Sequence, residues 1–257
     1  MRRTEASRCG LVAAALLGAS VAAGDGNPYL PIAGAEFRSA LPVGQQSPQL
    51  VRSFLLQQHA VTNAEFLAFV RANPQWRRGA VPVVLAGGDY LAHWAGPLDP
   101  GPPGVDLQPV TRVSWFAAEA YCEAQAARLP YWLEWEFVAA AGVRERDARS
   151  DPAWRQQILD WYAHPASAPL LPVEQRVANV YGVYDLHGLV WEWVQDFNSL
   201  LPSDADPEKF CGGAAQNLQQ KENYAILMRI ALLGSLQATD TGRAVGFRCA
   251  RDGENAP

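Results

Sequence analysis

Hydrophobic residues recur with helical spacing in three segments, 62–73, 115–127 and 132–141. The first begins at Thr62, and Glu65 follows at the spacing of a capping box, in which each side chain bonds the other's backbone N–H. Phe66, Leu67, Phe69 and Val70 would form its buried face. Asn73-Pro74 ends the pattern because proline does not continue a helix. We therefore predict a helix between Thr62 and Asn73.

Two central helices are predicted by the other segments. Ser114 is a good N-cap for a helix that starts at Trp115 and ends before Leu129-Pro130. A second helix, from about Trp132 to Ala141, would close at Gly142, a typical C-cap residue.

Short β-type segments and loops make up most of the remaining pattern. Residues 24–58 alternate turn formers with apolar pairs and predict loops and edge strands. Further short strands are expected at 110–113, 181–184, 190–194 and 245–249. Residues 96–109 carry five prolines and several glycines, which predicts a long irregular loop within one domain. The chain thus reads as a single compact α+β domain of low regular secondary structure.

The first 23 residues have a different character. Arg2, Arg3 and Arg8 precede an apolar stretch that ends in small residues at Ala23. A basic N-terminal region, a short apolar run and small residues at a cleavage site are typical of a secretory signal peptide. A membrane span needs about 20 apolar residues, and this run is shorter. We predict a signal peptide at 1–23, a mature domain at 24–257 without a membrane span, and a secreted or periplasmic protein.

Charge and composition exclude two classes of protein. The chain is 49% hydrophobic and 18% charged, which excludes disorder. The net charge is −5, and the predicted mature chain, with 18 basic and 25 acidic residues, carries −7. Because nucleic-acid binding relies on Lys and Arg at phosphates, this balance argues against a nucleic-acid partner.

Common catalytic motifs are missing from the sequence. It contains no G-x-S-x-G, glycine-rich phosphate loop, H-E-x-x-H or C-x-x-C. The histidines are far apart in sequence and are better interpreted as surface or hydrogen-bonded residues than as metal ligands: His59, His93, His164 and His187.

One acidic segment, 185–193, has two interpretations. Asp185 and Glu192 bracket Gly188, and calcium prefers carboxylate and backbone oxygens. Alternatively, Asp185 caps a turn and Glu192 lies on the polar face of a strand whose other face carries Trp191 and Trp193. Spacing alone favours the second interpretation.

The thiols offer one candidate reactive group. Three cysteines remain after residue 23, which indicates one disulfide and one free thiol. Cys211 precedes two glycines, so it is accessible to act as a nucleophile or a soft-metal ligand. Free cysteines are, however, most often buried small hydrophobic residues. Met228 could add a thioether ligand but fits core packing better.

Several segments in order resemble the formylglycine-generating enzyme family, also called sulfatase-modifying factors. The resemblance covers roughly Phe54 to Arg251. It is carried by Val61-Thr62-Asn63-Ala64-Glu65-Phe66, Pro109-Val110-Thr111-Arg112-Val113-Ser114-Trp115, Ala120-Tyr121-Cys122, Arg128-Leu129-Pro130, Glu134-Trp135-Glu136, Tyr181-Gly182-Val183-Tyr184-Asp185, Gly188, Val190-Trp191-Glu192-Trp193 and Gly246-Phe247-Arg248-Cys249.

The resemblance implies a fold, a metal site and a disulfide. The family fold is a compact α+β domain related to C-type lectins. The family's calcium ligands match Asp185, Gly188, Val190 and Glu192, so calcium becomes the favoured interpretation of this segment. A second calcium site of the family is not carried over, because the stretch 144–180 departs from its pattern. The resemblance also implies a disulfide between Cys122 and Cys249. A second bridge of some members falls at Ala139 and Ile230, so both of its partners are absent.

The copper chemistry of the family is not matched. Its aerobic enzymes oxidise a substrate cysteine to formylglycine with dioxygen and copper(I), which two thiolates hold. The second of these cysteines falls on Ala225 and the first falls near Gln220, and neither position carries sulfur. The resemblance therefore does not extend to the copper site, and bound copper or iron is not expected there.

Three functions follow from this mixture. The favoured one is an exported accessory protein that recognises an extended segment of an exported partner enzyme and assists its maturation. The second is a metal-dependent oxidase with a relocated site at Cys211 and Met228. The third is a non-catalytic lectin-like binding or immunity module.

Overall fold

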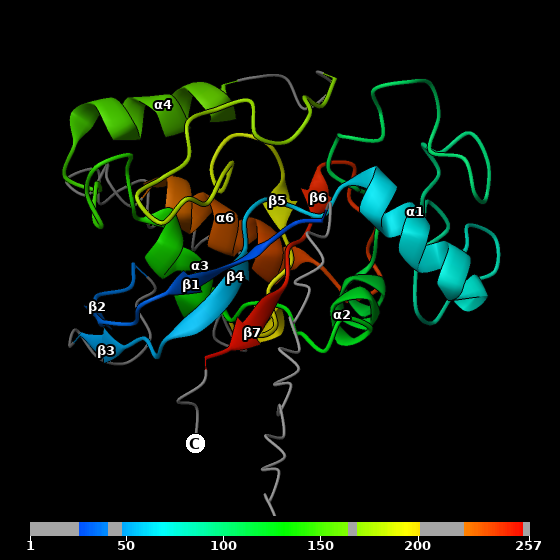
Figure 1. Ribbon diagram of the computed structural model, residues 1–257, viewed down its shortest axis with the longest axis horizontal. Helices are drawn as coiled ribbons and strands as arrows, with labels where there is room; N and C mark the ends of the chain where they lie inside the picture. Colours follow the sequence, from blue (N-terminus) through cyan, green and yellow to red (C-terminus); the bar gives the residue numbers. More distant parts are fainter. Residues whose placement is uncertain (1–25, 41–47, 164–168, 201–223, 254–257) are drawn as a thin grey trace, which may run out of the picture.

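A computed structural model describes residues 26–40, 48–163, 169–200 and 224–253 (Figure 1). The longer helices are α1 (Asn63–Ala72), α2 (Trp115–Glu123), α3 (Trp132–Ala139), α4 (Pro152–Tyr162) and α6 (Tyr224–Ser235), and the 3-10 turns are η1 (Pro74–Trp76) and η2 (Phe197–Ser199). The strands are β1 (Tyr29–Ile32), β2 (Glu36–Phe37), β3 (Gln49–Leu50), β4 (Phe54–Gln57), β5 (Trp191–Glu192), β6 (Val245–Gly246) and β7 (Ala250–Asp252). The predicted signal peptide lies outside the described residues, so it stays a prediction.

Three small sheets organise the chain. The largest has the order β1-β4-β7 and is antiparallel, so it joins the beginning of the described chain to its end. Strands β2 and β3 form an antiparallel pair, and β5 and β6 form a parallel one. In Figure 1, α4 lies above the β1-β4-β7 sheet at the upper left of the view, and α1 lies to its right. Loops connect most of these elements, as the prediction of low regular structure required.

The predicted helices are present, with different ends. Thr62 and Glu65 form the expected capping box of α1, and Asn73 is its C-cap. Ser114 caps α2, but that helix ends at Glu123, because the chain turns and Ala126 adopts a left-handed φ of 52°. Helix α3 ends at Ala139 with Ala140 as its C-cap, so the prediction that Gly142 caps it is wrong.

The predicted strands are only partly correct. Residues 110–113 form no strand, and Arg112 has a left-handed φ of 54°. Residues 181–184 form turns, whereas 190–194 and 245–249 contain the short strands β5 and β6. Residues 24–58 supply β1 to β4, and 96–109 is irregular, as predicted. Helices α4 and α6 were not predicted.

One hydrophobic core connects these elements. Phe66 of α1 stacks on Tyr121 of α2 with centroids 5.8 Å apart, and Tyr121 packs against Phe247 at 5.2 Å. Helix α6 contributes Ile226 and Ile230 to the same core. Because helices from both halves of the chain share this core, the prediction of a single α+β domain is confirmed.

The disulfide implied by the resemblance is present. Cys122 of α2 and Cys249, just before β7, are 127 positions apart in the sequence and joined with a Cα–Cα distance of 5.5 Å. Ala139 and Ile230, which match the second bridge of some relatives, are both buried apolar residues. Within the described ranges, none of the helices is long and apolar enough to cross a membrane.

Candidate functional site

The segment 185–192 is positioned by the parallel pair of β5 and β6. Trp191 pairs with Val245 and Glu192 with Gly246. Only glycine fits at 246, since an added Cβ would lie 2.7 Å from the carbonyl oxygen of Val110. This close approach packs β6 against the backbone at Val110. Arg248, two residues after Gly246, then lies beside Glu192.

Glu192 and Arg248 form a completely buried ion pair. Both side chains are 0% exposed, and the Arg248 Nη2 and Nε atoms lie 2.8 and 2.9 Å from the two carboxylate oxygens. The Trp135 indole N–H also donates to this carboxylate, at 2.9 Å. The alternative interpretation, with Glu192 on the polar face of a strand, is therefore wrong: the parallel pairing turns it into the core.

Arg248 also bonds the backbone of two further segments. Its Nη2 donates to the carbonyl of Tyr184 at 2.9 Å, and its Nη1 donates to the carbonyls of Gln57 and Gln58 at 3.2 Å. A buried charge is tolerated when hydrogen bonds satisfy it. One guanidinium thus ties β4, the start of the 185–192 loop and β5 together.

Asp185 bonds to a neighbouring loop. It has a left-handed φ of 59°, and its Oδ2 accepts the backbone N–H of Glu174 at 2.7 Å. Burial raises the pKa of its carboxyl. Gly188, with φ 111°, leaves room for Arg176, since an added Cβ would lie 2.2 Å from the Arg176 Nη1.

A second buried guanidinium lies on this loop. Arg229 of α6 is fully buried, and its Nη2 donates to the carbonyls of Leu186 and Val190 at 3.1 and 3.3 Å. Its guanidinium carbon lies 4.1 Å from the centroid of the Trp135 ring and 5.1 Å from that of Trp191. Such distances are typical of cation–π contacts.

The four residues matched to the family's calcium ligands come together, but their arrangement does not fit calcium. The Val190 carbonyl bonds Arg229, both Glu192 oxygens bond Arg248, and Asp185 accepts the Glu174 N–H. Calcium needs six to eight oxygens at about 2.3–2.6 Å, and the Val190 carbonyl, both Glu192 oxygens and Asp185 Oδ2 already accept hydrogen bonds from protein donors. In the described part of the chain, no group of three or more His, Cys, Asp or Glu side chains is suited to a metal ion. Calcium binding stays a prediction without support from this geometry.

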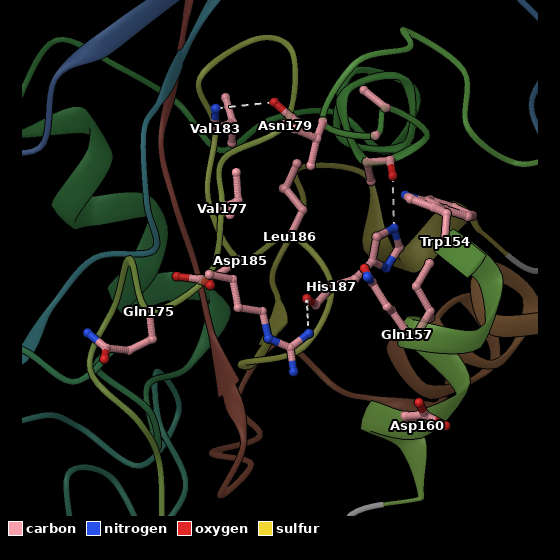
Figure 2. A pocket seen from close by; sticks show the side chains of 16 residues that line it. Trp154, Gln157, Asp160, Gln175, Val177, Asn179, Val183, Asp185, Leu186 and His187 are labelled. Carbon is pink, nitrogen blue, oxygen red and sulfur yellow. Dashed lines mark hydrogen bonds between the residues drawn. The ribbon is translucent and has the colours of Figure 1, made fainter. Parts of the chain in front are cut away.

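A cleft of about 540 Å³ lies beside this loop (Figure 2). Trp154, Gln157 and Asp160 of α4 line one side and Val177 lines the other, while the His187 ring packs against Trp154 with centroids 5.4 Å apart. The His187 Nε2 lies 2.9 Å from the carbonyl oxygen of Ala139. Burial, followed by the nearby charge of Arg229, lowers the pKa of His187 to about 3, so its ring is neutral at physiological pH. The cleft therefore presents a neutral imidazole and a mixture of apolar and polar groups.

The predicted histidine roles hold where the structure describes them. His59 Nδ1 lies 2.9 Å from the carbonyl oxygen of Ala60, and His187 is hydrogen bonded as above. His164 lies outside the described residues.

The predicted thiol site is only partly described. Cys211 and Gln220 lie outside the described residues, so the accessibility of Cys211 stays a prediction. Ala225 lies in α6, and Met228, one residue before Arg229, is partly buried. The two cysteines that the structure describes are consumed by the Cys122–Cys249 disulfide.

Two parts of the site were not found from the sequence. Helix α4 was missed although Asp151 and Pro152 are a good N-cap and first-turn pair. Arg229 was missed although it is a single charge inside an apolar run with helical spacing, Ile226, Ile230 and Leu233. The available signal was a single charged residue inside a run of apolar residues, since arginine is rarely buried without a partner.

Comparisons with known proteins identify the family and support the fold. Residues 21–253 match the family described as "Sulfatase-modifying factor enzyme 1-like domain". The formylglycine-generating enzyme of Streptomyces coelicolor is 28% identical over 250 residues, covering 79% of this chain and 80% of the relative. That of Thermomonospora curvata is 27% identical over 271 residues, covering 85% and 89%.

A solved structure supports the fold. The crystal structure of CarF superposes with a TM-score of 0.53 at 17% identity and covers 89% of this chain and 99% of CarF. At this identity the likeness shows the fold alone. Because the family match spans nearly the whole chain, the resemblance seen in the sequence is confirmed, and the chain belongs to the sulfatase-modifying factor enzyme 1-like family.

Proposed function

We propose that this chain is an exported accessory protein that binds an extended segment of a partner protein and does not carry out copper–thiolate oxidation. It would assist the maturation of an exported enzyme. The predicted signal peptide at 1–23 supports export, and the family's link to sulfatases supports a protein partner.

The number of free cysteines is the observation that supports the absence of copper–thiolate oxidation. The chain has four cysteines, and two of them form the Cys122–Cys249 disulfide. Cys9 lies within the predicted signal peptide, which leaves Cys211 as the single thiol of the mature chain. Copper(I) held by a pair of thiolates needs two. Ala225, at one of the matching positions, supplies a methyl group, so the mature chain lacks the donors for that chemistry.

Copper binding tests this step directly. Mature protein and its Cys211→Ala variant would be loaded with copper(I) under reducing conditions and analysed for bound metal. We expect less than one equivalent in both, and no oxidation of a sulfatase-derived cysteine peptide by mass spectrometry. One equivalent that is lost in Cys211→Ala, together with peptide oxidation, would establish the relocated oxidase instead.

The cleft beside α4 is the proposed place for the partner segment. Val143 and Val177 line it and are 58% and 76% exposed, so apolar side chains face solvent at its rim. Trp154 adds an aromatic surface. Exposed apolar side chains with polar groups beside them are typical of surfaces that bind other polypeptides.

A pair of matched variants tests the location. Val177→Asp places a charge in the cleft, whereas Val83→Asp changes a residue that is 85% exposed and is not among the cleft's lining residues. The neighbouring-gene product would be co-expressed with each form. We expect Val177→Asp alone to lose co-purification. Equal retention by both variants would exclude the cleft, and a mass change on the partner would indicate covalent modification rather than assisted maturation.

A further inference from the structure

The 185–192 loop is surrounded by arginine side chains. Arg248 holds its two ends, through the Tyr184 carbonyl and the Glu192 carboxylate. The Arg176 Nη1 lies 3.4 Å from the carbonyl oxygen of His187. Arg229 spans the middle of the loop. Positive charge from three different segments therefore faces this loop, and two of the contacted groups, the Val190 carbonyl and the Glu192 carboxylate, are ones that the family resemblance assigns to a calcium ion.

Arg229 makes the most central of these contacts. Its Nη2 bridges the carbonyls of Leu186 and Val190, at 3.1 and 3.3 Å, and so joins two points four residues apart. Burying a guanidinium is costly unless polar or aromatic groups replace its water. Trp135 and Trp191 supply two such aromatic faces at 4.1 and 5.1 Å. The two carbonyls and the two indole rings around this position therefore stabilise a positive charge.

Helix α6 delivers this cation. Ile226, Ile230 and Leu233 are buried at helical spacing and anchor the helix in the core. Arg229 lies on the same buried side of the helix, and its guanidinium reaches the 185–192 loop. The anchoring fixes the guanidinium without a bound ligand.

We propose that Arg229 is the internal cation of the 185–192 loop and replaces calcium there. Its guanidinium holds the Leu186 and Val190 carbonyls, and the folded protein needs no calcium at this site. The buried charge of Arg229 also opposes a divalent cation at the same carbonyls, because like charges repel at short range. This inference does not rest on the proposed function, since it concerns the loop and not a partner.

Metal content and thermal stability of the wild-type protein test the inference first. Purified mature protein would be analysed for calcium after dialysis, and its melting temperature measured with EGTA and with increasing calcium chloride. A ligand that binds the native state raises the melting temperature with its concentration. We expect sub-stoichiometric calcium and an unchanged melting temperature. One equivalent of retained calcium, or a melting temperature that rises with calcium, would overturn the proposal.

Hydrogen exchange at amides 186–192 tests the role of the side chain. Arg229→Met removes the charge and both hydrogen bonds, and we expect exchange there to accelerate by about tenfold or more, as the loss of charged hydrogen bonds predicts. Arg229→Lys keeps a charge at the carbonyls but loses the planar group between the tryptophans, so it should be intermediate. Arg176→Met removes one 3.4 Å contact to the His187 carbonyl from an exposed side chain, so it is the matched comparison and should accelerate exchange less than Arg229→Met.

Each result decides the question. Unchanged exchange in Arg229→Met, or an acceleration equal to that of Arg176→Met, would overturn the assignment. If Arg229→Met does not fold, Arg229→Lys and the calcium measurements on wild-type protein still separate an internal cation from a metal ion.

Discussion

Glu192 and Glu136 are both 0% exposed, yet the chain buries these two carboxyls in different ways. Glu192 shares both of its oxygens with the Arg248 guanidinium. Glu136 accepts from three neutral donors: the Ser39 hydroxyl, the Ala40 backbone N–H at 2.6 Å and the Trp132 indole N–H at 2.9 Å. One region neutralises a charge with an opposite charge, and the other surrounds it with dipoles.

This difference changes what each carboxyl does. Burial raises the pKa of Glu136, although the hydrogen bonds from Ala40 and Ser39 and the charge of Arg149 oppose the shift. Its carboxyl can therefore become neutral, and it ties the 39–40 segment to α3. Glu192 instead belongs to an ion pair that organises the 185–192 loop. The first region responds to pH, and the second depends on keeping both charges.

The largest effect is expected from Arg248→Met. The change leaves Glu192 as an uncompensated buried charge and removes the donors to three backbone carbonyls. Breaking a buried pair in this way costs about 3–5 kcal/mol of the free energy of unfolding. Urea denaturation followed by tryptophan fluorescence measures it.

The control lies three residues along the chain. Arg251 donates to the Gln125 carbonyl at 2.8 Å and lies 3.8 Å from the Tyr29 ring centroid, at a partly exposed position. Arg251→Met should cost about 1 kcal/mol. Equal losses of the free energy of unfolding in the two variants would show that the buried Arg248–Glu192 pair contributes no more to stability than the partly exposed arginine does.

Glu192→Gln is expected to have the next largest effect. The amide keeps one acceptor but turns an N–H₂ toward the guanidinium, whose charge then lacks its counter-charge. Arg248 keeps its bonds to the carbonyls of Gln57, Gln58 and Tyr184, so we expect a smaller loss, about 2–3 kcal/mol. The same urea titration measures it. A loss as large as that of Arg248→Met would mean that the carbonyl bonds contribute little.

Glu136→Gln should cost less, about 1–2 kcal/mol at neutral pH. The amide cannot accept from all three neutral donors, so at least one bond is lost, but no opposite charge is left unpaired in direct contact. Thermal unfolding of the two Gln variants side by side gives the comparison. If Glu136→Gln proves more destabilising than Glu192→Gln, dipoles alone stabilise a carboxylate here better than an arginine does.

Local signals in the sequence were sufficient for part of the fold. The capping box of α1 involves Thr62 and Glu65, three residues apart, and could be predicted because both partners belong to one turn. Helix α6 was missed since its run of apolar residues fits a strand as well as a helix. The C-terminal end of α2 depends on the turn at Ala126, and nothing about an alanine in the sequence indicates its left-handed conformation.

The site was harder to predict because its partners are distant in sequence. Glu192 and Arg248 are 56 residues apart, and nothing in the spacing pairs them. The family resemblance brought residues 185, 188, 190 and 192 together correctly as one loop. It could not reveal Arg229, because the cation that faces the loop comes from a helix whose sequence departs from the family's cysteine pattern.

The smallest effect, the pH dependence of the Glu136 region, is the sharpest test of the comparison. A carboxyl whose folded pKa is raised binds its proton more tightly in the native state than in the unfolded state. Its contribution to the free energy of unfolding is therefore fully present below the unfolded value, near 4.5, and is lost as pH rises through the folded pKa. His187 has the opposite sign: with a folded pKa of about 3, its contribution is lost as pH falls below about 6.5.

The difference between wild type and Glu136→Gln isolates the carboxyl, because His187 titrates equally in both proteins and cancels. Urea titrations between pH 4 and 7 measure the free energy of unfolding of both proteins. The excess of the wild-type value over that of Glu136→Gln should decrease as pH rises, by at most about 1.4 kcal/mol per pH unit for one proton. A wild-type advantage that grows with pH would mean that Ser39, Ala40 and Arg149 together stabilise the carboxylate of Glu136, and the two regions would then bury charge in the same way.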